Sequence, residues 1–122
     1  MRLRLARDGD LADLAWLTGT PAARLAPLHV VLAEDRDGVA GTMALAPEGR
    51  IDPVWAAEAD RGRAAATALY DAIEAEARRT GLARLTAPAE GAFAAFLARR
   101  GWRRTGAGAA TAEMERLLDP AR

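Results

Sequence analysis

The sequence of 122 residues contains no cysteine, lysine, serine, asparagine or glutamine, and only one histidine, His29. The lack of cysteine excludes disulfides, thiolate metal sites and a cysteine nucleophile. The other absences exclude a serine nucleophile, a Schiff-base lysine, a P-loop lysine and a metal site built from several histidines. If the chain is an enzyme, we therefore expect it to bring two substrates together and to move protons with carboxylates, backbone groups or water, without a covalent intermediate of its own.

Charge and hydropathy limit the classes further. Seventeen basic and seventeen acidic residues give a formal net charge of zero, which argues against non-specific binding to nucleic acid or to an anionic membrane. There is no run of 18 apolar residues, and the opening Met-Arg-Leu-Arg-Leu has no apolar signal core, so we expect a cytoplasmic protein. The length predicts one domain over residues 1–122. A GC-rich coding bias explains the frequent alanine.

The longest periodic stretch covers residues 59–81. Its apolar residues recur at helical spacing and form one stripe, made of Ala66, Leu69, Tyr70, Ile73 and Ala77. Glu74 lies four residues before Arg78 on another face, in the order that stabilises a helix. Asp60 is the expected N-cap and Gly81 the expected C′ residue. The pattern predicts a helix of about five turns.

The start of this helix carries Arg61, Gly62 and Arg63. The first amides of a helix have no partners within it, and with the helix dipole they attract anions. Two guanidinium groups add full charges, and a glycine lets a ligand approach the backbone closely. An alternative is equally open, in which both arginines are solvated at the start of an alanine-rich helix.

The remaining patterns predict an α+β fold with a mixed, mainly antiparallel twisted sheet of six or seven strands and helices on both faces. Gly41 inside its strand indicates a bulge or a close backbone approach, and Pro53 should loosen the pairing of its own strand. The strands at 50–57 and 83–87 flank the long helix, so they should run parallel and leave a ligand-sized gap where they part. The other expected elements are a strand at Leu3 and Leu5, a helix capped by Asp8, a hairpin at 29–45, a helix at 89–100, and a closing hairpin of residues 102–106 and 109–118. The first helix should turn Leu11, Leu14 and Ala15 inward with Trp16 beside them, and the second should turn Phe93, Phe96 and Leu97 inward.

The chain resembles the GNAT family of N-acetyltransferases almost from end to end. Arg61-Gly62-Arg63-Ala64-Ala65-Ala66 lies where that family carries its acetyl-CoA signature, Arg/Gln-x-x-Gly-x-Gly/Ala. Phe96-Leu-Ala-Arg-Arg-Gly101-Trp102 is similar to the family's Phe-Tyr-x-x-x-Gly-Phe. Residues 4–11, 31–41 and 114–117 resemble its first strand and helix entry, its second hairpin and its terminal strand.

The resemblance implies a mechanism in which an acetyl group passes directly from acetyl-CoA to an amine. It implies that the amides of residues 62–66 hold the pyrophosphate, with Arg61 and Arg63 assisting, and that the strand edge pairs with the pantetheine arm. The cofactor contacts expected in this way are Val54, Trp55, Ala56, Arg61, Gly62, Arg63, Ala64, Ala65 and Ala66. Two residues depart from the family pattern. Ala64 replaces a glycine and can crowd the phosphates, and Leu97 replaces a tyrosine that protonates the leaving thiolate in many members.

The general base is expected to be a carboxylate. Asp52, beside the predicted gap, is the first choice, although an edge carboxylate next to Pro53 would look the same. Glu90 is the second, although a residue that complements the helix dipole explains it better. Trp55 either lines the pocket or fills the core, and Tyr70 is expected in the core. The partners implied are acetyl-CoA and an amine, without metal, nucleic acid or membrane, and a homodimer stays open.

A second function agrees with the same residues. A degenerate GNAT-fold module would bind CoA or a protein partner without catalysis, and Ala64 and Leu97 favour it. The arginines at 99, 100, 103 and 104 could meet the 3′-phosphate of the cofactor or acidic partners, although a helix end and an exposed strand explain them better without a ligand.

Overall fold

The computed structural model describes residues 1–106 and 112–118. Seven strands in this part of the chain form two sheets. The first sheet is antiparallel throughout, with the order β1 (Arg2–Leu5), β2 (His29–Asp35), β3 (Gly38–Leu45) and β4 (Ile51–Ala56). The second has the order β5 (Arg84–Pro88), β7 (Glu113–Leu117) and β6 (Arg103–Thr105). The helical elements are η1 (Asp8–Asp10), α1 (Leu11–Thr18), α2 (Ala22–Leu25), α3 (Ala59–Arg79) and α4 (Gly91–Arg99).

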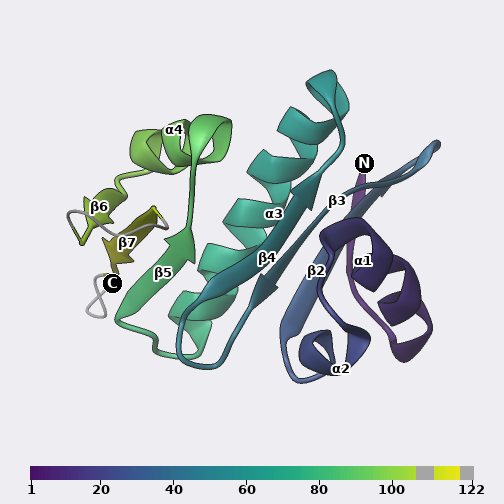
Figure 1. The fold of residues 1–122 in the computed structure, drawn as a ribbon, viewed down its shortest axis with the longest axis horizontal. Coiled ribbons are helices and arrows are strands. Elements are labelled where there is room, and N and C mark those ends of the chain that lie inside the picture. Colours follow the sequence, from purple (N-terminus) through teal and green to yellow (C-terminus); the bar gives the residue numbers. More distant parts are fainter. Residues whose placement is uncertain (107–111, 119–122) are drawn as a thin grey trace.

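Among the described residues, the backbone hydrogen bonding between the two sheets lies at the start of β4, beside β5. There the Thr86 amide donates to the Gly49 carbonyl at 3.0 Å, and Arg50 and Thr86 form a parallel bridge. Beyond this bridge the two strands diverge (Figure 1). The predicted parallel pair and the predicted gap are therefore confirmed.

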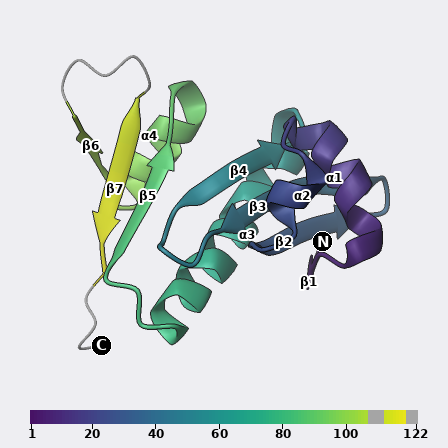
Figure 2. The same cartoon turned by 60° about the horizontal axis from the view of Figure 1, so that its bottom comes forward.

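Helices cover both faces of the first sheet (Figures 1 and 2). On one face, α1 and α2 bury Leu14 and Leu25 against Val30 and Leu32 of β2. On the other, α3 and α4 share a larger core with the inner faces of both sheets. The predicted α+β architecture with helices on both faces is thus confirmed.

The central part of α3 packs closely on β3. Gly41 makes this possible, because a Cβ atom there would lie 3.0 Å from both Ala65 Cβ and Leu69 Cδ1. A bulge between Ala33 and Glu34 accompanies it, so both expectations for Gly41 are confirmed.

The strands around Pro53 are also irregular. Met43 pairs with Val54 and Leu45 with Ile51, with a register shift between them, so the predicted loosening of the strand at Pro53 is confirmed.

The polar group at the centre of the larger core is the Tyr70 hydroxyl. It donates to Glu74 Oε1 at 2.7 Å and accepts from Trp102 Nε1 at 2.8 Å. Arg116 also donates to Glu74, at 2.5 Å, and so neutralises its charge. Tyr70 is 1% exposed, which confirms its prediction as a core residue. A buried phenol and indole without partners would be costly, and here both are satisfied.

Several predicted boundaries shift. Glu58, rather than Asp60, is the N-cap of α3, and Arg7, rather than Asp8, precedes the first helical turn. At that turn the Arg7 amide donates to Asp10 Oδ2 at 2.7 Å. Gly81, with φ of 80°, follows the Thr80 C-cap as predicted.

The last two predicted elements agree with the structure in part. The second helix is shorter than predicted, at Gly91–Arg99. The closing hairpin is confirmed for β6 and β7, and the part of it at residues 107–111 lies outside the described residues.

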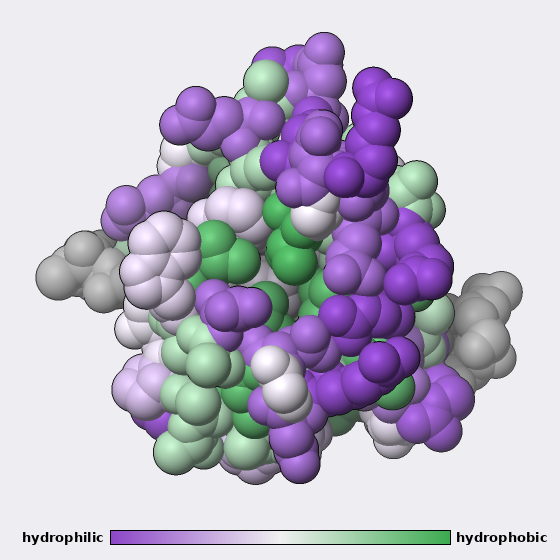
Figure 3. Space-filling model, turned by 90° about the vertical axis from the view of Figure 1, so that its right-hand side faces the viewer, coloured by the Kyte–Doolittle hydropathy of each residue, from purple (hydrophilic) through white to green (hydrophobic). Residues whose placement is uncertain are grey.

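The inner stripe of α1 is confirmed, because Leu11, Leu14 and Ala15 belong to the smaller core. Trp16, predicted beside this stripe, is 84% exposed. Figure 3 shows the α1 side of the molecule, where hydrophilic side chains surround a small group of hydrophobic ones near the centre. Among the described helices, none has the length and apolar character needed to cross a membrane.

Candidate functional site

A cavity of about 680 Å³ lies where β4 and β5 part. Its walls come from β4, the end of β5, the first two turns of α3, and α4. Its lining consists of Ile51, Asp52, Val54, Ala56, Ala57, Ala59, Gly62, Arg63, Ala66, Thr67, Pro88, Ala92, Phe93, Phe96 and Arg99. The volume is in the range of small-molecule sites. The wall is mainly apolar, with polar groups at Asp52, Arg63, Thr67 and Arg99.

The amino end of α3 opens into this cavity. Glu58 at the N-cap is extended and makes no side-chain capping hydrogen bond, and no other side chain of the described residues caps the first amides of α3. The next residue, Ala59, has φ of 62°, an uncommon conformation for a residue with a side chain. Such turns place successive amides around a common point and favour an anion there. The end of α3 is therefore suited to a phosphate group.

Gly62 is required by a contact within the protein. A Cβ atom there would lie 1.7 Å from the Ala57 carbonyl oxygen. Ala57 is itself held by a hydrogen bond from its amide to the Ala40 carbonyl at 2.9 Å. The absence of a side chain thus lets α3 begin directly against the end of β4, which places the first turn of the helix at the cavity.

The charged groups of the lining are exposed at its rim. Arg63 contacts Asp60 at 2.9 Å, but both side chains are more than four-fifths exposed, so this pair leaves the guanidinium accessible. Arg99 reaches the same cavity from the last turn of α4. The Thr67 hydroxyl donates to the Arg63 carbonyl at 3.2 Å. Two guanidinium groups therefore flank the cavity from opposite helices.

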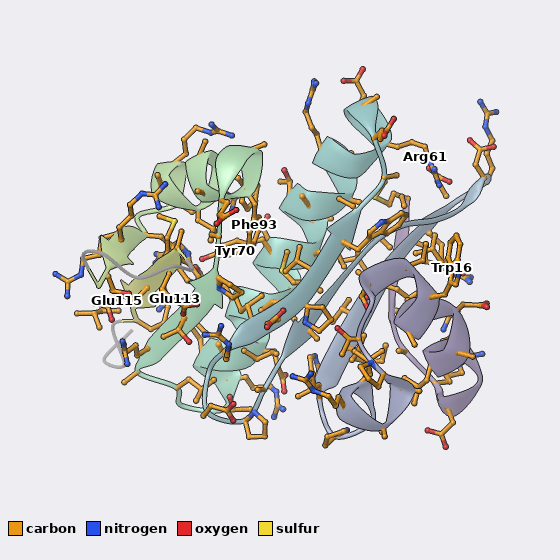
Figure 4. All side chains as sticks on the ribbon, in the orientation of Figure 1. Trp16, Arg61, Tyr70, Phe93, Glu113 and Glu115 are labelled. Atoms are coloured by element: carbon orange, nitrogen blue, oxygen red, sulfur yellow. The ribbon has the colours of Figure 1, made fainter. Side chains whose placement is uncertain are left out.

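Arg61 points away from the cavity, toward the β2–β3 hairpin (Figure 4). Its Nε and Nη2 donate to the two carboxylate oxygens of Asp35 at 2.6 and 3.0 Å. This pairing holds the pKa of Asp35 below its usual value and raises that of Arg61. Arg61 therefore joins α3 to the hairpin and lies outside the cavity lining.

The expected site residues divide into two groups. Those that line the cavity are Asp52, Val54, Ala56, Gly62, Arg63 and Ala66. Those outside its lining are Trp55, Arg61, Ala64, Ala65 and Glu90.

Position on the helix and strand explains the second group. Ala65 is fully buried toward β3, and Ala64 is exposed on the far side of α3, so its methyl group leaves the cavity uncrowded. Trp55 lies on β4 between two lining residues and pairs with Thr42. Glu90 is exposed at the N-cap of α4, where it complements the helix dipole.

Sequence reasoning did not assign Thr67, Phe93 and Phe96 to the site, whereas Arg99, which it named as able to meet a cofactor phosphate, lines the cavity. Both phenylalanines face inward as predicted and pack against the larger core; they also stack on each other with ring centroids 6.2 Å apart and line the cavity. Figure 4 shows Phe93 on the side of α4 that faces α3. The helical period could have found Thr67, because it follows Arg63 by four residues and therefore shares its face.

Leu97, at the position of the family's tyrosine, is fully buried and lies outside the lining. It has no proton to donate. Among the described residues, no group of three or more histidine, aspartate or glutamate side chains could hold a metal ion.

The comparison with family models finds the acetyltransferase (GNAT) family over residues 6–102. The chain belongs to the GNAT acetyltransferase family. A comparison with curated proteins finds no match. Solved structures of similar fold include a GCN5-related N-acetyltransferase from Rhodopseudomonas palustris, with a TM-score of 0.79 and 22% identity over 96% of this chain and 95% of that one.

Two other structural relatives carry their ligand in the crystal. The Mycobacterium tuberculosis protein Rv2747, in complex with CoA, has a TM-score of 0.79 and 18% identity over 97% of this chain and 99% of that one. A Salmonella typhimurium acetyltransferase with acetyl-CoA has a TM-score of 0.70 and 18% identity over 97% and 94% of the two chains. At these identities the likeness shows that this GNAT protein shares their fold.

Proposed function

We propose that this GNAT protein transfers an acetyl group from acetyl-CoA directly to an amine. The observation that carries the proposal is the cavity between β4 and β5, into which the uncapped amino end of α3 opens. Acetyl-CoA supplies an activated acetyl thioester. One relative of the same fold binds CoA and another binds acetyl-CoA, which supports the assignment.

The residues of the cavity match the chemistry of this cofactor. Its pyrophosphate is an anion, which suits the amides that follow Ala59, with Arg63 and Arg99 beside them. Its pantetheine arm is strand-like and carries amide groups. Val54 and Ala56 pair with β3 on one side only, and beyond the Arg50–Thr86 bridge the other side of β4 has no strand partner within the described chain. That edge can therefore bind the arm as it would bind an added strand.

Asp52 is the general base in this proposal. Among the described residues it is the one carboxylate in the lining, and its side chain is 46% exposed. Glu90, the other base suggested by the sequence, lies outside the lining. Asp52 takes a proton from the ammonium form of the acceptor, and the protein holds the amine and the thioester together. Proximity of this kind contributes about 7–11 kcal/mol at most to lowering a barrier.

The test combines binding and turnover. Titration calorimetry should show acetyl-CoA binding, and a thiol-release assay with a panel of amines should show turnover. Asp52→Asn should leave acetyl-CoA affinity unchanged and lower kcat by about 100-fold or more, the usual contribution of a general base. Glu90→Gln is the matched control and should retain the wild-type rate. The absence of acetyl-CoA binding would refute the proposal.

A second function is favoured by Leu97. Because this buried side chain cannot protonate a leaving thiolate, a module that binds CoA without turnover agrees with the same cavity. Acetyl-CoA binding without thiol release across the amine panel would support the module over the enzyme.

A further inference from the structure

A second cavity, of about 410 Å³, lies beside β4 toward α2. Its walls are the α1–α2 connection, α2, and the turn between β3 and β4. Its lining consists of Thr20, Ala23, Arg24, Pro27, Leu28, Ala46, Glu48, Arg50, Asp52 and Pro53. Asp52 lines this cavity and the larger one as well. A molecule in the second cavity can therefore present a group to Asp52 at the boundary with the first.

Arg50, which lines this second cavity, is paired with a carboxylate outside it. Its Nη1 and Nη2 donate to the two carboxylate oxygens of Glu113 on β7 at 2.8 and 3.0 Å. Glu113 raises the pKa of Arg50, and Arg50 lowers that of Glu113. Arg50 Nε lies 3.9 Å from Asp52 Oδ2, which is beyond hydrogen-bond range. The charge of Arg50 is thus balanced by Glu113, and Asp52 keeps its capacity to bind a cation.

Arg24 is the second cation of this cavity. It is exposed on α2, and its guanidinium has no hydrogen-bond or ion-pair partner among the described residues. Guanidinium groups bind carboxylates through two parallel hydrogen bonds. Besides the paired Arg50, the cavity therefore offers a cationic group, Arg24, from α2 and two carboxylates, Glu48 on the β3–β4 turn and Asp52 on β4.

We propose that the acceptor is a small amine that carries its own carboxylate, of the amino-acid class, with its carboxylate at Arg24 and its ammonium at Asp52. This inference depends on the proposed acetyl transfer. A single small molecule suits a cavity of this size. A polyamine, the main alternative, would be repelled by Arg24 and would have to place its second ammonium group at Glu48 instead, and the spermidine arm of the experiment distinguishes this case.

The ammonium first loses one proton to Asp52, which passes it to solvent. The amine nitrogen then forms a bond to the acetyl carbonyl carbon as the carbon–sulfur bond breaks. The second proton leaves the nitrogen through water and ends on the sulfur of CoA, so the products are an N-acetylated acid and the free thiol.

The experiment measures thiol release with matched acceptors. The panel pairs each of the common amino acids with its carboxamide, and adds spermidine and kanamycin. We expect kcat/KM for at least one acid to exceed that for its carboxamide by about tenfold or more, as expected when a charge-assisted hydrogen bond is lost. Arg24→Ala should remove this preference mainly by raising KM, and Arg24→Lys should restore part of it. Arg36→Ala, a change to an exposed arginine outside this cavity, is the control.

The outcomes separate the two proposals. Acetyl-CoA affinity is measured for every variant by calorimetry. If the wild type does not bind acetyl-CoA, or releases no thiol with any amine, both the proposed acetyl transfer and the proposed acceptor class are overturned. Turnover in which carboxamides or spermidine match the acids, or in which Arg24→Ala keeps the preference for acids, overturns the acceptor class alone.

Discussion

Replacement of Gly62 by alanine tests the position of the α3 start most directly. Two effects oppose each other. Alanine stabilises a helix interior by about 1 kcal/mol relative to glycine. The new Cβ, however, would lie 1.7 Å from the Ala57 oxygen, and even a separation of 3.0 Å, the shortest that real Cβ atoms show, requires the two to part by about 1.3 Å. Ala57 is tied to β3 through Ala40, so most of this shift falls on the helix.

The magnitudes decide the sign of the Gly62→Ala effect. Overpacking of this kind costs about 1–3 kcal/mol and occasionally more, which exceeds the gain in helix propensity. The free energy of unfolding should therefore fall. The shift of the helix start should also weaken acetyl-CoA binding, because the first turn of α3 lines the cavity.

Urea unfolding followed by circular dichroism measures the stability, and calorimetry measures the affinity. Gly9→Ala is the matched control, because a Cβ atom at Gly9 would meet nothing within 4 Å. That variant should keep the wild-type stability within about 0.5 kcal/mol, as surface substitutions usually do. An unchanged or increased stability of Gly62→Ala would refute the packing argument, and an unchanged acetyl-CoA affinity would separate the helix start from the binding site.

Two further predictions concern charged side chains. Arg61→Ala should leave acetyl-CoA affinity within about twofold, because Arg61 binds Asp35 outside the cavity. Arg99→Ala should weaken the affinity about tenfold, because it removes a charge-assisted contact. Calorimetry that ranks the two variants in the opposite order would contradict the site. Hydrogen bonds from Arg4 and the Arg7 amide lower the pKa of Asp10 to about 2, so the stability that they supply is present above the ordinary pKa of the carboxyl and is lost as the pH falls toward 2. Urea unfolding should show wild type and Asp10→Asn converging over this range, and a constant difference would contradict it.

Local patterns in the sequence predicted the elements and their order. The stripe through Leu69 and Ile73 fixes the face of α3, and Gly81 marks its end, because both signals depend on residues within a few turns of each other. The parallel strands on either side of α3 follow from the handedness of such crossovers. The same local signals placed the start of α3 at Asp60, two residues after the observed N-cap, Glu58.

The contacts that decide which side chains reach the site join residues far apart in the sequence. The sequence alone therefore did not fully predict which side chains line the cavity. Arg61 is drawn away by Asp35, which lies 26 residues earlier. The reason for Gly62 is the carbonyl of Ala57, whose position depends on a hydrogen bond to β3. Phe93 was expected in the core, and its second contact, with the cavity, depends on how far β4 and β5 diverge.

The divergence of β4 and β5 is itself a consequence of particular residues. A hydrogen bond from Thr86 to Gly49 and the Arg50–Glu113 ion pair join the two sheets at one end. Toward the cavity each of the two strands carries a proline, Pro53 in β4 and Pro88 at the end of β5, and neither has an N–H group to donate to a ladder. Neither proline can therefore donate a ladder hydrogen bond across the gap. Beyond the Arg50–Thr86 bridge the edge of β4 has no strand partner among the described residues, so a ligand with amide groups can bind along it without first breaking a strand pair.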